Sequence, residues 1–300
     1  MDIIINQILI MATLMTLGFI LRKLGYFNDE VTSGLSSFLL RIIIPLTIIE
    51  CFIQEFNFEL LKMMAIIAFI TVIFTFIIIF ICEHIFKSTH HIEKFASVFS
   101  NRGFIGIPII RSLFGTTAIP YLTPIIFVGH LFMWTYGINL LSEEKQKLKF
   151  STVFLNPNAK GVWIGLIIFI LPISLPAFLD SSVRSLTAIN TPLAMIILGV
   201  YLANENLREI FTNKMGYYVS FVRLVLLPAV SIAFMYFMPF DILVKQVFVI
   251  AMSVPSAANT AMFSELLGQN PSYGAQLVSL NTILSALTLP VVIMIMQSVF

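Results

Sequence analysis

The stretch from residue 101 to 115, NRGFIGIPIIRSLFG, combines residue types that suit the binding of an anion. Asn101 can donate hydrogen bonds to a carboxylate, and Arg102 and Arg111 carry full positive charges. Three further residues allow the backbone to leave helical geometry, because glycine tolerates unusual dihedral angles and proline lacks an N–H donor. They are Gly103, Gly106 and Pro108. This stretch is therefore the first candidate for a binding site.

A second stretch, VPSAANT at 254–260, has a related character and a regular distance from the first. Pro255 follows Pro108 by 147 positions (255 − 108), and Pro192 follows Pro45 by the same 147 (192 − 45). Two polar residues close the second stretch, Asn259 and Thr260. The same separation relates two more pairs, Gly18 with Gly165 and Asn57 with Asn204. The chain therefore resembles two copies of one unit.

The elements that must hold these residues lie in a membrane. Hydrophobic residues make up 59% of the chain and charged residues 11%, and the mean hydropathy is +0.99. Apolar runs long enough to cross a bilayer recur along the chain, and they are continuous rather than alternating, which predicts helices and excludes a β-barrel. The N-terminal run lacks a basic region and a cleavage site, so we expect a retained span. The net charge of +2 does not indicate a nucleic-acid partner, and two unpaired cysteines indicate no disulfide, metal or other cofactor.

Ten apolar runs organise the chain, and the predicted fold is all-α and integral to the membrane. The runs lie at 3–21, 35–53, 61–82, 95–114, 119–140, 160–178, 186–203, 213–237, 246–267 and 274–298. Because each unit then holds an odd number of spans, the two units have opposite orientations, as in many secondary transporters. The expected units are 1–141 and 159–300, joined by a cytoplasmic loop at 142–158.

The distribution of basic residues sets the expected orientation. Connections after odd-numbered runs hold ten Lys and Arg residues, and the opposite connections hold only Lys62, Arg184 and Lys245. Cytoplasmic loops carry the excess of positive charge. We therefore expect a multi-pass protein of the cell membrane with both termini outside the cell.

Pro108 and Pro255 fall near the middle of the fourth and ninth runs, so we expect each of these helices to be interrupted there. Two broken helices that cross at mid-membrane present positive helix N-termini to an anion. Asn281 in the tenth run either lines this site or binds a neighbouring helix. Glu265 and His130 are candidates for coupling to a proton or another ion, with a surface or packing role as the alternative for each.

Five motifs resemble the auxin efflux carrier family, whose bacterial members include malonate and malate carriers. They are NRGFIGIPIIRSLFG, TPLAMIILGVYLA, FLNPNAKG, VPSAANTAMFSELLGQNPSYG and the following AQLVSLNTILSALTLP, in family order over essentially the whole chain. The resemblance implies a ten-span inverted fold, related to bile-acid/sodium symporters, in which the fourth and ninth helices cross. It implies a scaffold of spans one, two, six and seven beside a core that moves like an elevator.

The resemblance also assigns roles by position. Asn101 matches an asparagine that contacts substrate, and Pro108 and Pro255 match the crossover prolines. Arg111 matches a position that is often basic, whereas Arg102 replaces a small or neutral residue. Arg102 either supplies charge for a more acidic substrate or points away from the site.

These observations predict a secondary carrier of small organic anions, either monocarboxylates or dicarboxylates such as malate and malonate, or auxin-like acids. A passive anion channel and an intramembrane enzyme are the alternatives, although no familiar catalytic motif is present. The expected partners are the substrate anion, membrane lipid and a coupling ion, with H⁺, Na⁺ and uncoupled transport all open. A homodimer through the scaffold is compatible with the sequence.

Overall fold

The computed structural model describes residues 2–53, 56–142, 157–171, 176–203 and 207–300. Across these ranges the chain is helical, with one isolated β-bridge and no strand. Most of the expected connecting loop at 142–158, and Asn204 of the proposed repeat, lie outside the described residues.

The helices of the N-terminal half follow the first five apolar runs. The first three runs hold α1 (Asp2–Lys23), α2 (Asp29–Phe38) continuing through a π-turn into α3 (Ile44–Phe52), and α4 (Phe58–Ile85). The fourth holds α5 (His91–Val98) and α6 (Ile107–Phe114), and the fifth holds α7 (Ile119–Phe132) and α8 (Ile138–Leu141).

The helices of the C-terminal half follow the remaining runs. They are α10 (Pro157–Ile170), α11 (Ala177–Ala188), α12 (Asn190–Leu202), α13 (Leu207–Thr212), α14 (Lys214–Phe221), α15 (Leu227–Tyr236), α16 (Ile242–Ser253), α17 (Asn259–Leu266) and α18 (Pro271–Val299). Six helical stretches among the described residues are long and apolar enough to cross a membrane. The protein is therefore an all-helical, multi-pass membrane protein.

Asparagine side chains begin several of these helices. Asn57 accepts a hydrogen bond from the Leu60 N–H at the start of α4, and Asn213 accepts one from the Gly216 N–H at the start of α14. Asn28 and Asn270 do the same for α2 and α18. Each side chain satisfies a backbone donor that has no partner within the helix.

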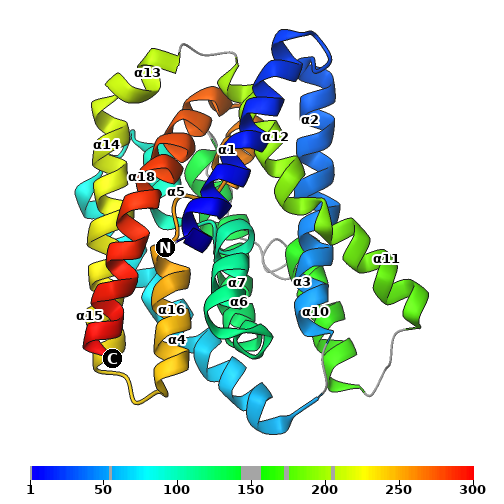
Figure 1. Ribbon diagram of the computed structural model, residues 1–300, viewed down its shortest axis with the longest axis vertical. Coiled ribbons are helices and arrows are strands. Elements are labelled where there is room, and N and C mark those ends of the chain that lie inside the picture. The colour runs from blue at the N-terminus through cyan, green and yellow to red at the C-terminus, as the bar shows by residue number, and fades with distance from the viewer. Residues whose placement is uncertain (1, 54–55, 143–156, 172–175, 204–206) are drawn as a thin grey trace.

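Two groups of helices lie side by side in Figure 1, with α2, α3, α10 and α11 at the right and α14, α15, α16 and α18 at the left. Two helix pairs are reciprocal, since α1 packs on α12 while α10 packs on α3. Glycines allow both contacts. A Cβ atom at Gly18 would collide with the Ile196 backbone, and one at Gly161 would lie 2.7 Å from the Pro45 carbonyl oxygen.

Prolines in the membrane helices are accommodated by π-turns. The π-turns at Leu39–Ile43, Arg102–Gly106 and Val222–Leu226 each lead into a helix with proline near its first residue. A wider turn removes the clash between the proline ring and the preceding carbonyl and does not require the missing N–H. Pro108 therefore lies inside a continuous helical stretch.

The prediction of a break at Pro108 is therefore wrong. The fourth run is broken at 99–101, between α5 and the π-turn, several residues before Pro108. The ninth run is broken at 254–258, between α16 and α17, and this break does contain Pro255. The two prolines are consequently not structural equivalents.

Candidate functional site

The two breaks lie against each other. Ser100 and Ser256 form an antiparallel bridge. The Asn101 N–H donates to the Pro255 carbonyl at 2.8 Å, and the Ala257 N–H donates to the Phe99 carbonyl at 2.9 Å. The extended segments thereby satisfy part of the backbone that the missing helical turns leave unpaired. Helix N-termini leave this bridge on one side, at Arg102 and Asn259, and helix C-termini reach it at Val98 and Ser253.

Arg223 binds the two helix C-termini. Its side chain is fully buried and donates to the carbonyls of Ser97, Met252 and Val254, which end α5 and α16. These carbonyls are the negative ends of the two helix dipoles, with a charge equivalent to about −0.5 each. One guanidinium thus balances the C-terminal ends of both half-helices.

A small cavity lies on the other side, at the helix N-termini. Its volume is about 40 Å³, enough for a few water molecules. Both breaks contribute to its walls, together with Thr47 of α3, Asn190 of α12 and the α7 segment from Ile126 to His130. The cavity therefore lies between α3 and α12, which we call the α3–α12 group, and the broken helices.

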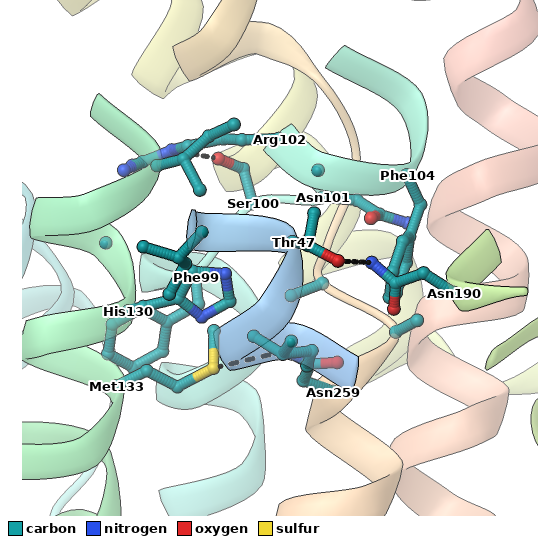
Figure 2. Close-up of a pocket in the computed structure, with 17 residues that line it drawn as sticks. Thr47, Phe99, Ser100, Asn101, Arg102, Phe104, His130, Met133, Asn190 and Asn259 are labelled. Atoms are coloured by element: carbon teal, nitrogen blue, oxygen red, sulfur yellow. Dashed lines mark hydrogen bonds between the residues drawn. The ribbon is translucent and has the colours of Figure 1, made fainter. Parts of the chain in front are cut away.

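Several polar atoms at this cavity are buried without a hydrogen-bond partner (Figure 2). They are the amide nitrogen of Asn101, the amide oxygens of Asn190 and Asn259, and Nδ1 of His130. The three asparagines are at most 6% exposed. The amide nitrogen of Asn190 donates a hydrogen bond to the Thr47 hydroxyl at 3.2 Å, so only its amide oxygen is without a partner. Because buried polar groups are normally satisfied, such a cluster indicates that water or a polar ligand binds in this cavity.

Arg102 places a full charge at the same cavity. Its guanidinium turns away from Asn101 (Figure 2) and donates to the Ser100 hydroxyl, the Ile125 carbonyl and the Met252 sulfur. It is 5% exposed, and none of the ion pairs among the described residues includes Arg102 or Arg223. Three of the five guanidinium N–H groups are used, so the charge is oriented but not neutralised.

The structure brings together some of the residues expected from the sequence and separates others. Asn101, Arg102, Gly103, Asn259 and His130 line the cavity. Another group lies outside it, comprising Gly106, Arg111, Pro255, Thr260, Asn281 and Glu265. Arg111 is exposed on α6, and Thr260 donates to the Ala257 carbonyl at 2.7 Å.

Asn281 holds the second break against a neighbouring helix. Its amide oxygen accepts the Ser256 N–H at 3.3 Å, and its amide nitrogen donates to the Ser220 hydroxyl at 3.0 Å. Of the two roles that the sequence allowed, the contacts are those of a residue that binds a neighbouring segment.

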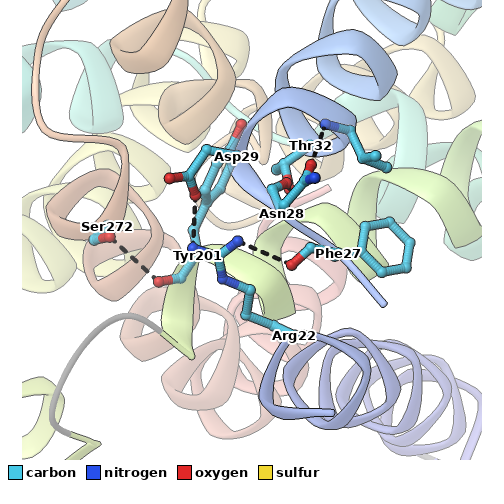
Figure 3. Close-up of polar contacts among 8 residues, drawn as sticks. Arg22, Phe27, Asn28, Asp29, Thr32, Tyr201 and Ser272 are labelled. Carbon is cyan, nitrogen blue, oxygen red and sulfur yellow. Dashed lines mark hydrogen bonds and ion pairs between the residues drawn. The ribbon is translucent and has the colours of Figure 1, made fainter. Parts of the chain in front are cut away.

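Glu265 links α17 to α12 and α2. It accepts the Tyr201 hydroxyl at 2.6 Å, and that hydroxyl also bonds to Ser36 at 2.7 Å. The Ser272 hydroxyl donates to the Tyr201 backbone carbonyl at 3.2 Å (Figure 3). Beside this contact Arg22 ties the end of α1 to Asp29 at the start of α2.

Thr47 and Asn190 are cavity residues that sequence reasoning missed. Each lies two positions from a proline of the repeated pair, Thr47 after Pro45 and Asn190 before Pro192. A polar residue beside proline in an otherwise apolar helix was the pattern that could have identified them.

This geometry defines a class: a multi-pass helical membrane protein with a buried polar site between two broken helices. A model of the family described as "Membrane transport protein" matches residues 3–154 and 150–293, so the chain belongs to this family, which is of the auxin efflux carrier type. The chain is also similar to the uncharacterized transporter MJ1031 of Methanocaldococcus jannaschii, with 27% identity over 281 residues, which cover 87% of this chain and 88% of that protein.

Proposed function

We propose that the protein is a secondary carrier of small organic anions, with mono- or dicarboxylates such as malate and malonate as the substrate class. The observation that carries this proposal is the unpartnered amide nitrogen of Asn101 beside a buried arginine that has no carboxylate partner among the described residues. A carboxylate accepts hydrogen bonds from Asn101 and brings negative charge to Arg102. The unpartnered amide oxygens of Asn190 and Asn259 need a donor instead, which water or a substrate hydroxyl such as that of malate supplies.

The charge around the crossing favours a dicarboxylate. Arg223 offsets the two helix C-termini, whose combined charge is equivalent to about −1. On the cavity side, two helix N-termini contribute about +0.5 each and Arg102 contributes a full charge, so the total is about +2. A dianion matches this total, whereas a monocarboxylate leaves about half of it uncompensated.

Transport by an elevator-like movement accounts for the position of the cavity. Thr47 and Asn190 belong to the α3–α12 group, whereas Asn101, Arg102 and Asn259 belong to the broken helices. Sliding of one group past the other carries the cavity between the two membrane faces and breaks the contact of Asn190 with the rest of the site. The Tyr201–Glu265 bond crosses the same boundary and must break as well.

The proposed topology has ten spans in two inverted units, residues 1–141 and 159–300, in the cell membrane with both termini outside. The reciprocal packing of α1 on α12 and α10 on α3 supports it, because an inverted repeat exchanges these pairs. The asparagine caps of α4 and α14 also occupy equivalent positions in the two units.

Uptake into proteoliposomes tests the function. We expect saturable uptake of labelled malate or malonate, competition by other small carboxylates, and strong loss in an Asn101→Ala variant. Imposed proton and sodium gradients identify a coupling ion. Uptake that does not saturate would favour a channel, and recovery of a chemically altered compound would favour an enzyme. Protein-free liposomes are the control.

A further inference from the structure

The buried charge at the cavity has a consequence for the transport cycle. We infer that the protein is an exchanger. An anion is bound each time the carrier passes through its occluded state, in the forward step and in the return step, and no inorganic cation is needed. The inference rests on the proposed function, and it concerns the return step of the carrier rather than the identity of the substrate.

Arg102 keeps its charge and has no carboxylate partner among the described residues. An arginine side chain remains protonated in proteins. Its three acceptors are a hydroxyl, a carbonyl and a thioether sulfur, all uncharged. The nearby Arg223 is already engaged with four hydrogen bonds to carbonyls, so its surroundings do not neutralise Arg102.

The cavity offers the Arg102 guanidinium little solvation. A volume of about 40 Å³ admits only a few water molecules. A buried charge without a counter-charge has a large desolvation cost, and attraction to an opposite charge offsets that cost most strongly in a low-dielectric site. The closed state is therefore favoured with an anion and disfavoured without one.

The charge of the cavity disfavours binding of a cation. In the part of the chain that the structure describes, no aspartate or glutamate lines the cavity, and its positive side already holds Arg102 and two helix N-termini. A sodium ion in this cavity would be repelled by the same charge that attracts the substrate. The tethered guanidinium thus occupies the electrostatic role that a co-transported cation has in a symporter.

Efflux from proteoliposomes distinguishes exchange from net transport. Vesicles are loaded with labelled malate, and the membrane potential is clamped with potassium and valinomycin. Efflux is then measured into HEPES buffer with or without unlabelled malate, and with sodium or choline as the external cation. We expect external malate to accelerate efflux at least tenfold, and sodium to have no effect. Equal efflux with and without external malate, or a requirement for sodium, would overturn the inference.

Matched variants test the part played by the charge. Arg102→Gln is expected to reduce the ratio of exchange to net efflux toward one, because the empty cavity then closes without an unpaired cation. Arg102→Lys keeps the charge and should keep a high ratio. Arg41→Gln removes a charge from an exposed position and should leave the ratio unchanged.

The failures of the two proposals remain distinguishable. Absence of efflux in every buffer, for malate, malonate and acetate alike, would contradict the carrier function and the exchange together. Saturable net efflux whose rate does not depend on external malate would contradict exchange alone. A ratio that stays high in Arg102→Gln would also contradict it. If Arg102→Gln does not fold, the efflux of the wild-type protein with and without external malate still tests the exchange.

Discussion

Ser100 and Ser256 face each other in the antiparallel bridge, and each hydroxyl caps the other broken helix. The Ser100 hydroxyl donates to the Ala251 carbonyl of α16 at 3.1 Å, and the Ser256 hydroxyl donates to the Ala96 carbonyl of α5 at 2.7 Å. Each break thus stabilises the C-terminal end of the opposite half-helix. The two breaks are mutually dependent, because neither can straighten without exposing a carbonyl of the other half-helix.

This exchange predicts a loss of stability when one serine is removed. Ser256→Ala leaves the buried Ala96 carbonyl without that donor, at an expected cost of about 1–3 kcal/mol. The measurement is thermal unfolding of the purified protein in detergent. Ser298→Ala is the control, because that exposed hydroxyl bonds only within its own helix, to Ile295. Equal unfolding temperatures for the two variants would contradict the capping role.

A second prediction separates a substrate-binding asparagine from a supporting one. Asn101→Ala removes an unpartnered amide from the cavity, so it should raise KM for malate about tenfold or more while the unfolding temperature changes little. Asn281→Ala removes two buried hydrogen bonds away from the cavity, so it should lower the unfolding temperature with a smaller effect on KM. Uptake kinetics and thermal unfolding of both variants check this contrast. The opposite pattern would show that Asn281 binds substrate.

A third prediction concerns the close contact of α1 with α12. Gly199→Val places side-chain atoms against the Met15 and Phe19 backbone, where there is no space, and should prevent stable folding or separate the two helices. Gly34→Ala is the matched control, since a Cβ there meets no atom within 4 Å. Yield and monodispersity in size-exclusion chromatography are the measurements. A well-folded Gly199→Val protein would contradict the reciprocal packing.

A fourth prediction tests the topology by thiol labelling. With Cys51 and Cys82 replaced, cysteine is introduced at exposed Ser88, after α4, or at exposed Asp241, before α16. An impermeant maleimide added to intact cells should label position 241 and not position 88. Permeabilised cells provide the control for reactivity at both positions. Labelling of position 88 in intact cells would contradict the proposed orientation.

The sequence predicted the neighbourhood of the site better than its geometry. Asn101, Asn259 and the broken fourth and ninth runs are where the residue types indicated. The separation of 147 does not describe how the two breaks pair, because the structure places Ser100 opposite Ser256, a separation of 156 (256 − 100). The caps Asn57 and Asn213 share this separation of 156 (213 − 57).

The error has a physical reason. Proline can be accommodated either by a break or by a π-turn, and both relieve the same steric clash. Which one forms depends on whether another segment supplies hydrogen bonds to the exposed backbone. At Pro255 the Asn101 N–H does so, whereas Pro108 lies in a continuous helix behind a π-turn.

The sequence by itself determined the class of protein, because a backbone in lipid is satisfied in helices or closed barrels and long continuous apolar runs lack the alternation of barrel strands. It also determined that polar residues and helix-breaking residues coincide in the fourth and ninth runs. Only the tertiary structure decided the roles of the arginines. Arg102 comes to the cavity, Arg223 caps two helix ends and Arg111 remains exposed, since the neighbours that decide each role lie far away in the chain.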